Sequence, residues 1–186
     1  MNQTHDHRAQ STIEEAKKLV IDSIAETMDL YGVTRSVGTL YGTMYFEEDM
    51  SLDEMREELG MSKPSMSSGV KKLQEFNMVK NTFRKGSRKH TFIAEKDFFR
   101  FFKNFFSKKW EREVVINLEA VQRAQAKLQS VMDSKDVSDD IKQQAFIIFD
   151  QLEESKTYYH WLKKLVKVIQ TDEIFKYVPI DEKEHV

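Results

Sequence analysis

Apolar residues recur at helical spacing through most of the chain. In residues 12–30 they share one helix face and are Ile13, Ala16, Val20, Ile24 and Met28. Gly32 predicts the end of this helix, and a second helix is predicted over 34–46. A short third helix opens with a capping box, in which Ser51 and Glu54 each accept a hydrogen bond from the other's backbone N–H.

The segment LGMSKPSMSSGVKKL, residues 59–73, is predicted to form a helix with two different faces. Gly60 ends the preceding helix, Ser62 is the predicted N-cap, and Pro64 lies in the first turn, where its missing N–H costs nothing. Gly69 lies on the inner side and would let another helix approach closely. The inner face carries the apolar residues Met66, Val70 and Leu73. The outer face therefore consists of small hydroxyls and lysines.

The hydrophobic period then changes from helical to alternating. Residues 79–83 (VKNTF) and 89–93 (KHTFI) are predicted strands, joined by a turn with Gly86 at its tip. This pattern predicts a β-hairpin with a basic tip.

Two long helices follow, one predicted over 95–132 and one that ends near residue 169, with a break at 134–138. Both carry a series of mostly apolar positions that follow alternating steps of four and three, with one step of seven in the second helix. In the first helix these positions are Val114, Leu118, Val121, Gln125, Leu128 and Met132. In the second they are Ile141, Ala145, Ile148, Leu152, Tyr159, Leu162, Val166 and Ile169. We expect the helices to form an antiparallel hairpin and the first of them also to join a dimer interface.

Composition excludes several classes of function. The 186 residues include no cysteine, which rules out disulfides, thiolate metal sites and cysteine nucleophiles. No run of eighteen apolar residues could span a membrane, and the polar start is not a signal peptide, so we expect a cytoplasmic protein. No catalytic or nucleotide-binding motif is present. We therefore expect no enzymatic activity, no cofactor and no bound metal.

Charge is concentrated in one part of the chain. Residues 61–90 contain eight lysines and arginines but one acid, Glu75, whereas the whole chain has a net charge of -2. Such a basic block favours a polyanion-binding face, although a merely solvated basic face has the same composition. The acids Glu47, Glu48 and Asp49 follow a helix end and are interpreted as a solvated loop.

The order of helix, short helix, turn, polar-faced helix and basic hairpin is typical of a winged helix-turn-helix. We predict a mainly α fold, with a β-hairpin wing and long helical dimerisation extensions. Predicted major-groove contacts are Ser62, Lys63, Ser65, Ser67, Ser68, Lys71 and Lys72. Predicted contacts to the backbone or minor groove are Arg84, Lys85, Arg88 and Lys89. A winged helix used for protein assembly, or a DNA-binding protein without a ligand, remains an alternative.

Five segments are predicted along the chain. They are a disordered tail over 1–10, an N-terminal helix belonging to the dimerisation region over 11–33, the DNA-binding domain over 34–95, the dimerisation and ligand-linking helices over 96–178, and a C-terminal tail over 179–186.

The stretch YGVTRSVGTLYGTMYFEEDMSLDEMREELGMSKPSMSSGVKKLQEFNMVKNTFRKGSRKHTFIAEKDF resembles the GbsR-type branch of the MarR-like bacterial regulators. The resemblance is close over residues 31–112 and extends to the general plan of the later helices. It implies a homodimeric repressor of genes for choline uptake and glycine betaine synthesis. It also implies release from operator DNA by choline or a related osmolyte.

Aromatic residues suggest where such a ligand would bind. The segment DFFRFFKNFFSKKW, residues 97–110, spreads its aromatic rings over a wider arc than one packing contact uses. We expect Gly38 and Gly42 to leave open volume. The predicted walls are Tyr41, Tyr45, Phe99, Phe106 and Trp110. Such walls suit a quaternary ammonium ion through cation–π contacts, and binding would then change the spacing of two recognition helices. Plain hydrophobic packing is the alternative for each ring.

Overall fold

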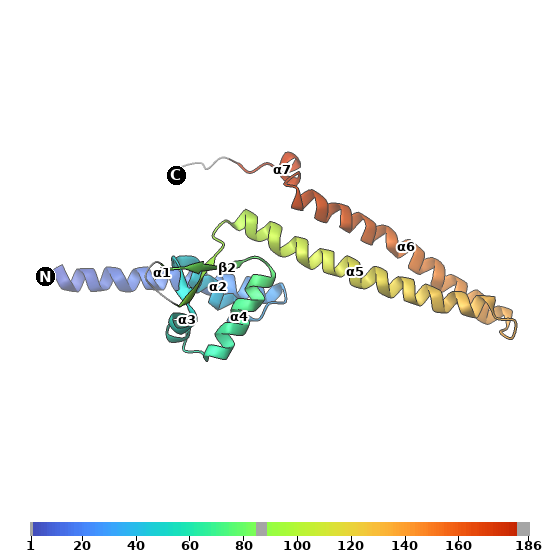
Figure 1. Cartoon of the computed structure of the whole chain (residues 1–186). Coiled ribbons are helices and arrows are strands. Elements are labelled where there is room, and N and C mark those ends of the chain that lie inside the picture. Colours follow the sequence, from blue (N-terminus) through green and yellow to red (C-terminus); the bar gives the residue numbers. More distant parts are fainter. Residues whose placement is uncertain (1, 85–88, 182–186) are drawn as a thin grey trace. The chain divides into compact units, whose positions relative to one another are not determined.

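The computed structural model describes residues 2–84 and 89–181, and the chain divides into two compact units, residues 1–101 and 102–186 (Figure 1). The first unit holds four helices and a small sheet, and the second holds a helical hairpin. No helix in the described part of the chain is long and apolar enough to cross a membrane.

Helix α1, Asn2–Leu30, begins earlier than expected. Residues 1–10 were predicted to be a disordered tail, but the helix already includes Asn2. No glycine or proline interrupts this stretch, and side chains one turn apart support it. Gln10 donates to Glu14 at 3.1 Å, and Ser11 donates to Glu15 at 3.2 Å.

Helix α2, Arg35–Phe46, packs against α1 with the two backbones in contact. A Cβ atom added to Gly38 would lie 2.7 Å from the Cα atom of Ala25. One added to Gly42 would lie 3.1 Å from the Cα atom of Ile21. The prediction that these glycines leave open volume is therefore wrong, because α1 fills that space.

Helices α3, Leu52–Leu59, and α4, Lys63–Glu75, form the helix-turn-helix. The capping box at the start of α3 is confirmed, with the Ser51 N–H donating to Glu54 at 2.7 Å. Gly60 ends α3 in the left-handed conformation, at a φ of 63°. The inner face of α4 is buried as predicted, and a Cβ atom on Gly69 would lie 2.8 Å from Leu40 Cδ2 of α2. The two helices can cross this closely because Gly69 has no side chain.

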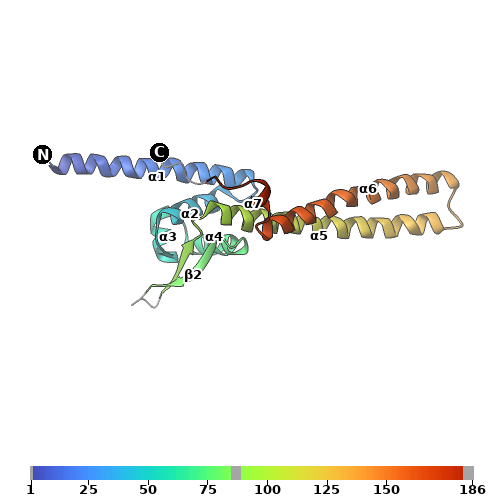
Figure 2. The same ribbon diagram turned by 90° about the horizontal axis from the view of Figure 1, so that it is seen from above.

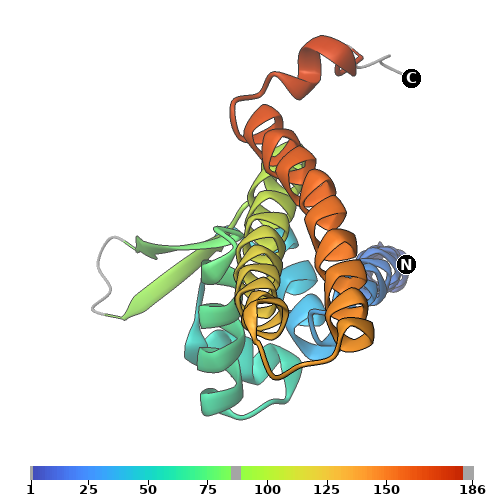
Figure 3. The same cartoon turned by 90° about the vertical axis from the view of Figure 1, so that its right-hand side faces the viewer.

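A three-stranded antiparallel sheet completes the winged helix-turn-helix. Its strands are β1, Met50–Ser51, β2, Val79–Phe83, and β3, His90–Ala94, in the order β1-β3-β2. The predicted hairpin is confirmed, and Figures 2 and 3 show it projecting from the helices of this unit. Strand β1 was not predicted, because two residues are too short to show an alternating pattern.

The second unit contains most of helix α5, Phe98–Asp133, together with α6, Asp139–Gln170, and the short α7, Ile174–Tyr177. Helices α5 and α6 lie side by side as the predicted antiparallel hairpin (Figures 1 and 2). The buried residues that α5 and α6 contribute to this unit include Val114, Val121, Ala145, Leu162, Val166 and Ile169. Ile141 and Ile148 were predicted in the same series, but 46% and 47% of their surfaces are exposed. They lie at the edge of the buried stripe.

One polar residue lies within the apolar seam of the hairpin. Gln125 is buried, and its amide donates to Glu153 Oε2 at 2.9 Å and to the carbonyl of Phe149 at 3.4 Å. A buried polar side chain keeps these hydrogen bonds in only one alignment of the two helices. Gln125 therefore favours a single register for the hairpin.

Candidate nucleic-acid interface

The outer face of α4 carries small hydroxyls and lysines, as predicted. Ser65 and Ser68 are exposed, and Ser67 is half-buried. Ser62 is the N-cap: its hydroxyl accepts from the Ser65 N–H at 3.3 Å and lies 2.8 Å from the Ser65 hydroxyl. Ser62 and Ser65 therefore hold the first turn of α4 as well as lying on its surface.

The three lysines of α4 differ in their surroundings. Lys72 lies 2.8 Å from Glu75 and over the ring of Phe76. Lys63 lies 2.8 Å from Asp53 of α3. Lys71 is exposed and forms no ion pair with any residue in the described ranges. Lys71 is thus the α4 lysine most accessible to a DNA phosphate or base.

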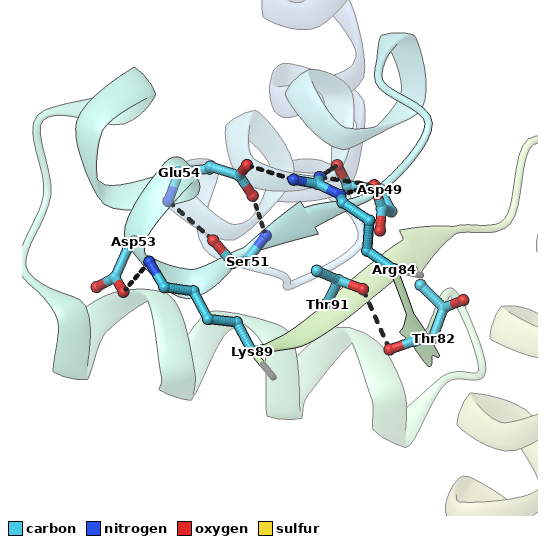
Figure 4. A network of polar contacts seen from close by, with 8 residues as sticks. All are labelled: Asp49, Ser51, Asp53, Glu54, Thr82, Arg84, Lys89 and Thr91. Atoms are coloured by element: carbon cyan, nitrogen blue, oxygen red, sulfur yellow. Dashed lines mark hydrogen bonds and ion pairs between the residues drawn. The ribbon is translucent and has the colours of Figure 1, made fainter. Parts of the chain in front are cut away.

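Arg84, at the end of β2, is held by two carboxylates (Figure 4). Its Nη2 and Nε atoms lie 2.7 Å and 3.1 Å from Asp49 Oδ1, and its Nη1 lies 2.8 Å from Glu54 Oε1. Nη2 also donates to the Asp49 carbonyl at 3.1 Å. In the free protein this arginine ties the wing to the start of α3. That Arg84 contacts DNA stays a prediction. The interpretation of Asp49 as part of a solvated loop is wrong, because its carboxylate binds Arg84.

The same contacts alter the acidity of the carboxylates. The hydrogen bond from Arg84, followed by those from Ser51, lowers the pKa of Glu54 to about 2. Hydrogen bonding to Arg84 also lowers the pKa of Asp49, and hydrogen bonding to Lys63 lowers the pKa of Asp53. The acids beneath the wing therefore stay ionised at neutral pH.

Several predicted DNA-contacting residues are brought together by this arrangement. Lys89 lies 3.5 Å from Asp53, the carboxylate that also binds Lys63, so the wing and α4 meet at one acid. The predicted contacts Lys85 and Arg88 lie outside the described residues. Sequence reasoning missed the role of the acids because they lie far from Arg84 and Lys89 along the chain.

The predicted ligand-binding aromatics within the first unit differ in their exposure. Tyr41 is fully buried, and its hydroxyl donates to the Glu95 carbonyl at 2.6 Å. Burial and the nearby Glu95 raise the Tyr41 pKa above its ordinary range, so the hydroxyl remains a donor. The Tyr45 ring stacks on Phe98 at 5.2 Å, whereas 48% of the Phe99 surface is exposed.

The other two predicted wall residues lie on α5 within the second unit. The Phe106 and Trp110 rings are 5.3 Å apart, and both residues are half-buried. Tyr41 is part of the hydrophobic core. The other predicted wall residues keep some exposed surface: Tyr45, Phe99, Phe106 and Trp110. These four remain the candidates for contact with a ligand.

Comparison with known proteins decides the family. Residues 98–176 match the model of the C-terminal helical hairpin of GbsR family transcriptional regulators. The HTH-type transcriptional repressor GbsR of Bacillus subtilis (strain 168) is 64% identical over 173 residues, which cover 93% of this chain and 96% of that protein. The chain belongs to the GbsR family. It is a helix-turn-helix transcriptional repressor and not an enzyme, as expected from the sequence.

Two less similar relatives also match over most of their length. The putative HTH-type transcriptional regulator YvaV of the same organism is 33% identical, over 90% of this chain and 94% of that protein. The repressor OpcR, also from B. subtilis, is 30% identical over 90% and 91% of the two chains. A crystal structure of a transcriptional regulator has a TM-score of 0.56 at 16% identity, covers 89% of this chain and supports the fold.

The low pKa of Glu54 predicts acid-sensitive stability. Its folded-state pKa is below the ordinary 4.5, so its stabilisation is complete above that pH and is lost as the pH falls toward 2. Replacing Glu54 by Gln retains an acceptor for the capping box but removes the charge. We expect the variant to be about 0.5–1 kcal/mol less stable at pH 7, because exposed pairs contribute little.

Urea unfolding of both proteins between neutral and acidic pH measures this difference, which should shrink as Glu54 becomes protonated. Glu58→Gln, on the same helix, removes a carboxylate with no ion pair in the described ranges and should run parallel to the wild type. A Glu54→Gln difference that is constant with pH would rule out the charge contribution.

Proposed function

We propose that this GbsR-family repressor acts in the cytoplasm as a homodimer on a pseudo-palindromic operator and is released by a quaternary-ammonium osmolyte. The regulated genes would be those for choline uptake and glycine betaine synthesis. The observation that carries the DNA-binding part is α4: its apolar face is buried, and its small hydroxyls and Lys71 face solvent.

The shape of α4 suits the major groove. Serine side chains are short, so the helix backbone can come close to base edges, and their hydroxyls accept or donate hydrogen bonds. The ammonium of Lys71 reaches guanine acceptors or phosphate oxygens. Of the proposed major-groove contacts, Ser67 and Lys72 are half-buried, and the others are exposed: Ser62, Lys63, Ser65, Ser68 and Lys71.

Exposed apolar residues on the helical hairpin support a homodimer. They include Val115, Ile116, Ile141, Phe146, Ile147 and Ile148. Helix α1 also exposes Ile13, Leu19 and Val20. Several exposed side chains of this size favour a contact with another protein surface, since leaving them in water forfeits about 25 cal/mol for each Å² of apolar area.

A groove along α5 and α6 supports a second copy of this chain as the partner. It encloses about 720 Å³, its floor includes Val114, Leu118 and Val166, and its two rims differ in charge. Helix α5 contributes Glu111 and Glu119, and α6 contributes Lys163 and Lys167. A twofold axis parallel to the groove would place each acidic rim against the basic rim of a second copy, so the surface is complementary to itself.

The aromatic residues on α5 support an effector of the quaternary-ammonium class. Methyl groups remove the hydrogen-bond donors of an ammonium ion and spread its charge, so an aromatic face binds it better than a carboxylate does. Phe99, Phe106 and Trp110 each keep some exposed surface. A ligand that contacts Phe106 and Trp110 would bias the repressor only if it binds the released and DNA-bound states with different affinity.

Replacing Lys71 by Ala tests the placement of α4. If Lys71 reads a base, the variant loses about 1–3 kcal/mol of binding at one operator position. If it contacts a phosphate, all duplexes are bound more weakly and the slope of log K against log salt falls by about one.

Fluorescence anisotropy with random and selected duplexes separates these cases. Lys96→Ala, with the same charge loss in a loop of the first unit, is the control, and an unchanged affinity and slope for Lys71→Ala would remove α4 from the interface.

Charge reversal tests the dimer. The variant Glu111→Lys/Glu119→Lys and the variant Lys163→Glu/Lys167→Glu should each dissociate at concentrations at least about tenfold higher than the wild type, because like charges then face each other. An equimolar mixture should form a heterodimer of wild-type affinity. Sedimentation velocity or native mass spectrometry measures this, and two variants that dimerise alone but gain nothing on mixing would exclude this pairing.

Calorimetric titration of choline and glycine betaine tests the effector. Removing the Trp110 ring as Trp110→Ala should weaken binding about 2- to 30-fold, and Trp110→Phe should weaken it less, because one cation–π contact contributes about 0.5–2 kcal/mol. Trp161→Ala, an exposed tryptophan on α6, is the matched control. Binding of neither compound would contradict the effector proposal and leave DNA binding intact.

A further inference from the structure

Asp53 joins the two parts of the proposed DNA-binding surface. It lies in the first turn of α3, and its two carboxylate oxygens face different lysines. Oδ1 is 2.8 Å from Nζ of Lys63, in the first turn of α4, and Oδ2 is 3.5 Å from Nζ of Lys89, beside β3. Figure 4 shows Lys89 extending toward this carboxylate from the wing.

These two contacts differ from the one that holds Arg84. The guanidinium of Arg84 is bound by two carboxylates and a backbone carbonyl, a rigid arrangement that positions the wing. Each lysine instead meets Asp53 through a single ammonium group on a flexible stem, and most of both side chains is exposed. Such exposed pairs add little to stability and can exchange for another anion.

A DNA phosphate presents the same chemistry as the Asp53 carboxylate. Both offer anionic oxygens to an ammonium group at about 2.8 Å. A phosphate that approaches Lys63 or Lys89 must therefore replace Asp53 or share the lysine with it. In either case a negative charge remains beside the DNA backbone. This charge makes binding less favourable, and one counterion that the lysine would otherwise displace stays on the DNA.

We propose that Asp53 is an internal competitor for DNA phosphate, which holds Lys63 and Lys89 in the free protein and weakens binding to duplex DNA of any sequence. This inference rests on the proposed placement of α4 and the wing on DNA. It assigns Asp53 a role in keeping the repressor from binding too tightly, so that a modest change in the protein is enough to release it.

Replacing Asp53 by Asn removes the charge and keeps the side-chain size. The dissociation constant for a random duplex at about 0.1 M salt should fall about three- to tenfold, and the slope of log K against log salt should steepen by about one. Fluorescence anisotropy from about 0.05 to 0.3 M salt measures both quantities. Unchanged or weaker binding, or a shallower slope, would overturn the proposal.

Two further variants separate local from general effects. Glu58→Gln makes the same charge change on α3 from a carboxylate without an ion pair in the described ranges, and it should change the affinity much less. Asp53→Glu retains a carboxylate and should bind as the wild type does; tighter binding by this variant would contradict the proposal.

The two proposals can fail separately. A wild-type protein without salt-dependent duplex binding would disprove the DNA placement itself. A wild type with steep salt dependence, together with an Asp53→Asn variant that matches Glu58→Gln, would disprove the competitor role alone. Thermal unfolding of each variant confirms that the compared proteins are folded.

Discussion

The burial of one face of α4 is the constraint on which the DNA-binding unit depends. Met66, Val70 and Leu73 are almost completely buried, and Gly69 lets Leu40 of α2 come within van der Waals contact. Because a helix has a fixed angular spacing, burying these residues leaves the serines and Lys71 facing outward. The chemistry of the outer face is therefore a consequence of packing on the inner face.

Ion pairs then decide which basic side chains of this unit are available to bind DNA. Arg84 is committed to Asp49 and Glu54, and it holds the wing in place. Lys63 and Lys89 share the more loosely bound Asp53, and Lys71 is exposed. The cations of this basic stretch, which look alike in the sequence, therefore differ in the structure: Arg84 positions the wing, Lys63 and Lys89 share an exchangeable partner, and Lys71 is exposed.

The second unit meets a different requirement. Two long helices in an antiparallel hairpin bury only one stripe each, so residues such as Phe146 and Ile147 stay exposed in a single chain. Gln125 and its hydrogen bond to Glu153 favour one register of α5 against α6. This register keeps the acidic rim of α5 and the basic rim of α6 at a constant offset along the groove. The proposed homodimer needs such regularity, since a slip of either helix would misalign the charges of the two rims.

Local patterns were enough to determine the winged helix-turn-helix, its caps, the hairpin and the two long helices, because periodicity and capping depend on residues a few positions apart. The same patterns placed the serines and lysines of α4 on its outer face. Contacts between distant residues needed the tertiary structure. Gly38 and Gly42 lie against α1, where open volume was expected, and Asp49 binds Arg84 from 35 positions away. Which lysines have acidic partners follows from how the chain folds back on itself, and no local spacing encodes that.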